Sequence, residues 1–262
     1  MRLLRRPILS LMLLALAWSA APLSAHAEDA GSGSGSGDAP FEIKMGDDKG
    51  PRVSGTMGML VAMTALAFIP ALLIMTTSFA RIIIVLGFLR HALSTQQTPP
   101  NVILLGMSMF LTIFIMAPIF NRVQKDALVP YMNGKLGNEE ALEKGLKPMR
   151  EFMGQQTRKK DLALMLELSN APAPKDLDDV PTTTLVPAFM LSELRTAFQM
   201  GFLIFLPFLV IDLVVAAVLM SLGMVMLPPS MISLPLKLLL FVMADGWYLI
   251  VRSLVASFAA AG

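Results

Sequence analysis

Charged side chains lie within or beside long apolar runs of this 262-residue sequence, where an isolated charge is costly and is a default functional candidate. Such groups can relay a proton or an ion, can form salt bridges between subunits, or can pair within one chain or extend to the polar boundary. A relay has few carboxylates to use here, yet all three interpretations stay open on the residues alone. Asp212 and Lys237 lie on neighbouring apolar runs and could pair with each other. The charged residues are Arg81, Glu193, Arg195, Asp212, Lys237, Asp245 and Arg252.

No motif in the sequence points to catalysis. The chain contains no cysteine, which excludes disulfides, thiolate metal sites and cysteine nucleophiles. It also contains no phosphate-binding loop of the Walker type, and no zinc-protease, nucleophile-elbow or paired-acid motif. We therefore expect no catalytic residue, no metal site and no cofactor, and we predict that the protein is not an enzyme.

The composition is that of a membrane protein. Hydrophobic residues make up 55% of the chain and charged residues only 15%, whereas a soluble domain carries about 25% charged residues. The net charge of +2 comes without a basic stripe, so nothing in the sequence indicates nucleic-acid binding.

Four apolar segments are each long enough to cross a bilayer, which takes about 20 helical residues. We predict an all-α membrane protein with four long hydrophobic helical segments in two hairpins and a small helical extracytoplasmic domain between them. The segments are 57–80 (continuing as 82–89), 102–120, 197–226 and 232–254. The hairpins are 57–120 and 187–262, and the domain between them is 121–186.

The N-terminus has the three parts of a secretory signal peptide. Arg2, Arg5 and Arg6 precede an apolar core, and Ala25 and Ala27 form a small-x-small cleavage pattern. We expect residues 1–27 to be removed and residues 28–56 to form a flexible Gly/Ser-rich acidic linker. Cleavage would leave the new N-terminus outside the cytoplasm. The positive charge at Arg90 would then lie on the cytoplasmic side, as the positive-inside rule expects.

The polar stretch between the hairpins shows helical periodicity. Residues 138–154 place Leu142, Leu146, Met149 and Phe152 at helical spacing, which predicts one helix. Residues 162–168 predict a second helix, and residues 176–181 predict a loop.

Methionine is abundant, with 21 residues, and it is concentrated where the third apolar segment ends. The string LMSLGMVMLPP covers residues 219–229. Methionine side chains are flexible and polarisable, so such a tip repeated around a ring could form a deformable closure. The alternative is that these positions are ordinary core or lipid-facing residues.

Long ordered strings in the sequence resemble the FliP family. They are PAFMLSELRTAFQMGF at 187–202 and PLKLLLFVMADGW at 235–247, with support from TSFARIIIVL at 77–86, EALEKG at 140–145 and REFM at 150–153. The resemblance extends over about residues 57–258.

This resemblance implies a core subunit of the flagellar type III protein-export gate. Members of the family form homo-oligomers and assemble with FliQ-like and FliR-like membrane subunits inside the flagellar basal body of the bacterial inner membrane. Unfolded flagellar proteins pass through the resulting pore, and other export-apparatus proteins supply the energy. A related protein of virulence secretion systems is typically shorter and lacks a cleaved signal, so the signal peptide favours the flagellar member.

Site residues follow from the same resemblance. Met224, Val225 and Met226 resemble a methionine gasket that narrows the pore. The implied subunit contacts are Phe152, Met165, Glu193 and Lys237, although the family often has phenylalanine at the position of Met165. Two other functions stay open on the residues alone, namely a secondary transporter of a small solute and a scaffold that only templates ring assembly.

Overall fold

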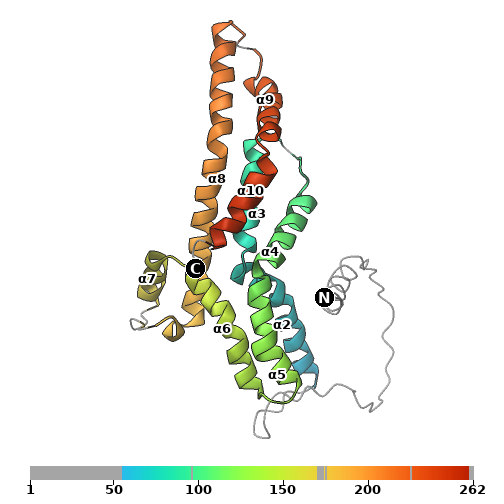
Figure 1. Ribbon diagram of the computed structural model, residues 1–262, viewed down its shortest axis with the longest axis vertical. Coiled ribbons are helices and arrows are strands. Elements are labelled where there is room, and N and C mark those ends of the chain that lie inside the picture. The colour runs from blue at the N-terminus through green and yellow to red at the C-terminus, as the bar shows by residue number, and fades with distance from the viewer. Residues whose placement is uncertain (1–54, 96, 170–173, 175, 225, 260–262) are drawn as a thin grey trace, which may run out of the picture. The chain divides into compact units, whose positions relative to one another are not determined.

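The computed structural model describes residues 55–95, 97–169, 174, 176–224 and 226–259, and residues 60–262 form one compact unit. The predicted signal peptide and nearly all of the predicted linker lie outside the described residues. Every regular element in the described residues is helical (Figure 1). These elements are α2 (Gly55–Thr76), α3 (Phe79–Ala92), α4 (Asn101–Val123), the π-helical η1 (Gln124–Leu128), α5 (Val129–Met132), α6 (Asn138–Gln156), α7 (Lys159–Leu168), the 3-10 helix η2 (Leu177–Asp179), α8 (Thr182–Ser221), α9 (Pro229–Met243) and α10 (Gly246–Ala259).

Two helices of the described part are long and apolar enough to cross a membrane, and up to four spans result if each of two bent helix pairs counts as one. The two continuous helices run over Asn101–Met132, with 32 residues, and over Thr182–Ser221, with 40 residues. The bent pairs are Leu66–Thr76 with Phe79–Ala92, at 68°, and Pro229–Met243 with Gly246–Ala259, at 65°. The prediction of an all-α fold is therefore confirmed over the described residues, which contain two continuous candidate spans, whereas the first and fourth segments are bent rather than continuous.

The break in the fourth segment has a local cause at the junction of α9 and α10. Asp245 has a φ of 50°, a left-handed conformation that aspartate tolerates better than most residues and that a helix cannot continue through. Gly246 follows, and a Cβ there would lie 2.2 Å from the ring of Phe241, so only glycine fits under that ring. Hydropathy alone does not reveal this turn because the residues on both sides are apolar.

The second and third segments are longer than the sequence predicted. Helix α4 continues through η1 and α5 to Met132, and α8 begins at Thr182 rather than near residue 197. Both ends of the stretch 121–186 therefore fall inside helices. Within that stretch the two predicted helices are present as α6 and α7, and the predicted loop contains η2.

Helix α8 is the element against which α3, α6, α7 and α9 pack (Figure 1). The ring of Phe88 on α3 meets that of Phe198 on α8 edge to face, with centroids 5.3 Å apart. Gly201 lies beneath Phe88, where a Cβ would come within 2.5 Å of the ring. This close approach lets α3 bury an apolar stripe, which consists of Ile82, Val85, Leu86 and Leu89.

The outward faces of α4, α8 and α9 are apolar. Large aliphatic and aromatic side chains are exposed along all three helices, far beyond the apolar patches of a few hundred Å² that soluble monomers carry. Such faces must be covered by lipid or by other protein. Examples with more than half of the side chain exposed are Val102, Phe110, Phe114, Phe198, Phe202, Leu203, Leu213, Leu239, Val242 and Met243.

Candidate functional site

Two separate clusters each pair a fully buried or nearly fully buried basic residue with an acid, and a methionine-rich turn lies beyond the second one. The first cluster joins α3 to α8 through Arg81 and Glu193. Arg81 is 2% exposed and Glu193 is fully buried. Arg81 Nε donates to Glu193 Oε2 at 2.8 Å, and Arg81 Nη2 donates to Glu193 Oε1, which makes the pair bidentate. The two residues thus satisfy each other inside one chain.

The remaining donors of Arg81 reach the other two helices of the same cluster. Nη2 also donates to Gln156 Oε1 on α6 at 3.1 Å. Nη1 donates to the Ser257 hydroxyl on α10 at 3.0 Å and to the Ser257 carbonyl at 3.4 Å. Gln156 Nε2 donates to the carbonyl of Phe258 at 3.1 Å, and the Phe258 ring lies over the guanidinium at 3.8 Å.

These contacts satisfy the end of α10. The last carbonyls of a helix have no partner within it and attract positive charge. Arg81 and Gln156 donate to the carbonyls of Ser257 and Phe258 in the final turn of α10. We call Arg81, Gln156, Glu193, Ser257 and Phe258 the Arg81 cluster.

The second cluster is centred on Lys237 of α9. Its amino group is fully buried and donates to Asp212 Oδ2 on α8 at 2.6 Å, to Ser94 Oγ at 2.6 Å and to the carbonyl of Ala92 at 3.2 Å. The Ala92 carbonyl closes α3, so the ammonium also interacts with the negative end of that helix. The pairing of Asp212 with Lys237, which the sequence allowed, is present.

The other ionisable residues of the apolar segments are exposed. Arg195 lies 3.9 Å from the buried carboxylate of Asp161, which accepts a hydrogen bond from Ser192 at 2.7 Å and links α7 to α8. Asp245 occupies the turn between α9 and α10, and Arg252 lies over the Tyr248 ring at 6.0 Å. The described residues contain no group of three His, Cys, Asp or Glu residues that could hold a metal ion.

The methionine-rich turn joins α8 to α9. Gly223 has a φ of 75°, its N–H donates to the Met220 carbonyl, and the Met224 N–H donates to the Leu219 carbonyl at 3.0 Å. These two hydrogen bonds are the Schellman arrangement that ends a helix on a glycine. Met224 is 40% exposed and Met226 is 97% exposed, whereas Val225 lies outside the described residues.

The predicted contact residues lie in different environments. Phe152 is 6% exposed and packs against the rings of Phe189 and Phe258. Met165 is half-buried on α7. Because Glu193 and Lys237 are fully buried within the chain, they can reach a neighbouring subunit only through the helices that they fasten together.

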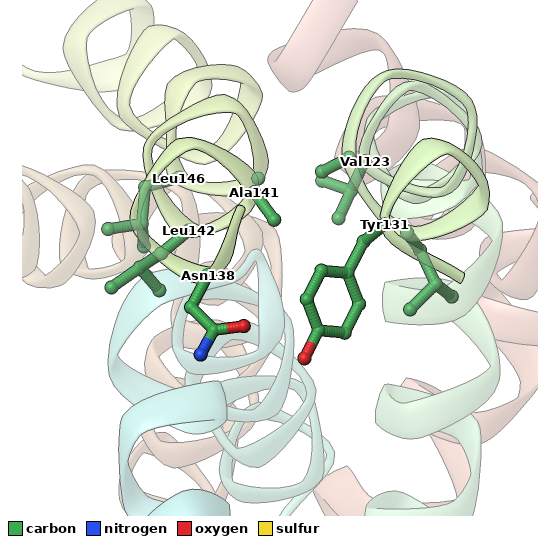
Figure 2. A pocket seen from close by; sticks show the side chains of 9 residues that line it. Val123, Tyr131, Asn138, Ala141, Leu142 and Leu146 are labelled. Atoms are coloured by element: carbon green, nitrogen blue, oxygen red, sulfur yellow. The ribbon is translucent and has the colours of Figure 1, made fainter. Parts of the chain in front are cut away.

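An apolar groove of about 350 Å³ lies between α6 and the η1–α5 stretch. Figure 2 shows Asn138 and Ala141 of α6 on one side and Val123 and Tyr131 on the other. This groove could not be predicted from the sequence, because the helical spacing of Leu142 does not show that its side chain is 64% exposed at the groove edge.

Sequence analysis missed Gln156, Ser257 and Asp161. Each is a polar residue of a helix, which usually faces solvent, and nothing in its type shows that it contacts a buried ion or hydroxyl. Arg81 was recognised as a buried charge, but its partner lies 112 residues away in the chain.

The long apolar helices and the buried ionic clusters are typical of a helical membrane protein. Residues 62–254 match the FliP family. Flagellar biosynthetic protein FliP of Bacillus subtilis is 55% identical over 206 residues, which cover 79% of this chain and 93% of the relative. The same-named protein of Pectobacterium carotovorum is 55% identical over 199 residues (76% and 77%), and that of Caulobacter vibrioides is 45% identical over 257 residues (97% and 92%).

The chain therefore belongs to the FliP family. Its relatives carry a name that describes flagellar biosynthesis rather than a catalytic activity.

Proposed function

We propose that this protein is a core subunit of the flagellar type III protein-export gate in the bacterial inner membrane. Several copies assemble with FliQ-like and FliR-like subunits within the flagellar basal body, and unfolded flagellar proteins pass through the pore. Membership of a flagellar biosynthesis family supports the flagellar part of this proposal. The protein acts as a conduit and not as an enzyme.

The observation that carries the proposal is the exposed methionine turn at the end of α8. Met226 is almost completely exposed, although a methionine that only stabilised the chain would be buried in a core. The turn is apolar, short and positioned by a glycine cap, so copies arranged around an axis would present a ring of flexible thioethers. Such a ring can fit closely around chains of different sequence and can close again after each has passed.

The exposed faces of α4, α8 and α9 provide the surfaces for assembly. They are too extensive for a soluble monomer and can be covered by neighbouring copies, by the partner subunits and by membrane lipid. In this proposal the hydrophobic segments are apolar because much of their surface packs against other subunits.

The proposal is tested first by the native mass of the detergent-extracted protein, produced with and without its neighbouring membrane subunits. A large, defined complex that includes the small partners is expected. A monomer or dimer that ignores those partners would overturn the export-gate function and favour a small-solute transporter.

The gasket is tested by ion conductance of the purified complex in a planar bilayer. Replacing both Met224 and Met226 by alanine is expected to raise the leak at least several-fold. Met132→Ala, which removes a methionine that is 76% exposed at the end of α5, is the matched control. An unchanged leak in the Met224/Met226 variant would refute the gasket, and an equal rise in the control would show that the effect is not specific to the turn.

A further inference from the structure

We propose that the Arg81 cluster is a latch inside each chain, which holds the last turn of α10 on α3, α6 and α8, and that assembly depends on Glu193 through this latch. The proposal rests on the export-gate function, in which the subunit works only as an oligomer. Arg81 is then the positioning residue, because it contacts Glu193, Gln156, Ser257 and the Phe258 ring at once.

The first observation behind the proposal is that Arg81 and Glu193 bind each other within one chain and leave no carboxylate oxygen free. Glu193 is fully buried in a single chain, and both carboxylate oxygens accept hydrogen bonds from Arg81. A second subunit would find no free carboxylate to bind. A planar guanidinium is also the group best suited to serve several acceptors at once, since its donors are fixed in one fork.

The second observation is that Arg81, on α3, has partners on three other helices that are far apart in the chain. Arg81 lies 112 residues from Glu193, 75 from Gln156 and 176 from Ser257. The two helices that carry Gln156 and Ser257 also meet directly, through the bond from Gln156 to the Phe258 carbonyl and through the stacked rings of Phe152 and Phe258. Loss of Arg81 would therefore remove the hydrogen bonds to Ser257 and the contact with the Phe258 ring, and would leave the contacts between α6 and α10 to hold the end of that helix.

The third observation concerns the exposed side chains of α10. Its outer face includes exposed aromatic and aliphatic side chains, among them Trp247, Tyr248 and Leu249. To contact a neighbouring subunit in an assembly, those side chains must point in a fixed direction. A latch at the far end of α10, together with the turn at Asp245, fixes that direction at both ends of the helix.

The test uses single variants and their combination in cis and in trans. Arg81→Met and Glu193→Leu each leave one unpaired buried charge, whereas the double variant in one chain leaves none. Two differently tagged chains, one with each change, are co-expressed for the trans arrangement. The readouts are the fraction of protein in the large complex on a native gel and the rate of trypsin cleavage after Arg252, an exposed residue of α10.

For an intrachain latch, each single variant is expected to speed cleavage after Arg252 on the order of a hundred-fold, and to lose the complex. The cis double variant has no unpaired charge but still lacks the bonds from Arg81 to Gln156 and Ser257, so its cleavage is expected to fall back to roughly tenfold above that of the unmodified chain, with part of the complex recovered. The trans mixture is expected to stay at the level of the single variants. Restoration in trans, or loss of the complex without any change in cleavage after Arg252, would overturn the latch and favour a direct contact between chains.

Two milder changes keep the test informative where the single variants do not accumulate. Gln156→Leu and Ser257→Ala retain the ion pair and each remove hydrogen bonds to a charged group, so cleavage after Arg252 is expected to rise roughly tenfold. Unchanged cleavage in both would overturn the proposal. Glu140→Ala with Lys144→Ala, which removes an exposed pair at 2.8 Å on α6, is the control and is expected to change neither readout.

The cleavage assay also separates the latch from the export-gate function. If the unmodified protein forms no large complex at all, the export-gate function fails. The comparison of cleavage rates between unmodified and variant chains still decides whether the latch exists.

Discussion

Removing Lys237 and removing Asp212 are expected to destabilise the protein unequally, although the two residues form one ion pair. Lys237 is fully buried, whereas the Asp212 side chain is 40% exposed. Asp212→Ala would leave a buried ammonium with only the Ser94 hydroxyl and the Ala92 carbonyl as partners. Lys237→Met would leave a carboxylate that water can reach.

The magnitudes follow from these exposures. Breaking a buried pair by removing one partner costs about 3–5 kcal/mol when the remaining charge stays buried. The lower end, about 3 kcal/mol, applies to Asp212→Ala, because two neutral acceptors remain for the ammonium. For Lys237→Met we expect about 1 kcal/mol, because solvent screens and hydrates the exposed carboxylate and the methionine retains most of the lysine's packing.

The assay is thermal unfolding of the detergent-extracted protein, followed by the fluorescence of Trp247. For a chain of this size a change of 1 kcal/mol moves the midpoint by about 2–4 °C, so shifts of about 6–12 °C for Asp212→Ala and about 2–4 °C for Lys237→Met are expected. The double variant should resemble Lys237→Met. Equal shifts, or a larger shift for Lys237→Met, would refute the assignment of the buried charge to Lys237.

Three further predictions follow from the packing. Gly201→Ala should cost about 1–3 kcal/mol by overpacking against Phe88, and Phe88→Leu in the same chain should recover most of the loss in the thermal assay. Leu86→Ala, in the buried stripe of α3, should cost about 2–5 kcal/mol, and a loss below 1 kcal/mol would mean that the stripe is not a packed core. Breaking the exposed pair of Arg122 and Glu151, at 2.6 Å, should cost less than about 1 kcal/mol, and a larger loss in urea unfolding would show that it is coupled to other residues.

The helical type of these elements could be predicted from the sequence, because periodicity and hydropathy depend only on residues close together in the chain. The apolar spacing from Leu142 to Phe152 identified α6, and the apolar run after Val102 identified α4. Pro207 did not break α8, since neighbouring groups can compensate for the one hydrogen bond that it removes.

Helix breaks and buried partners could not be predicted in the same way. The turn at Asp245 lies between two apolar stretches, so no change of hydropathy marks it. Arg81 was recognisable as a costly charge, but the identity of its partner depends on how α3 and α8 pack, which is a property of the whole fold. Asp212 and Lys237 could be paired because their segments are consecutive.

The length of α8 has a mechanical consequence. Glu193 and the end of the helix at Ser221 are 28 residues apart, which is up to about 42 Å at about 1.5 Å per residue. A rod of that length pivoting at the Arg81 cluster by about 5° would sweep its methionine-bearing end through about 4 Å, roughly two-thirds of the rise of one helical turn. In the proposed export gate, small adjustments near the base would thus be amplified into larger changes of the pore's aperture, and stiffness at the pivot would set how much force a passing chain must exert.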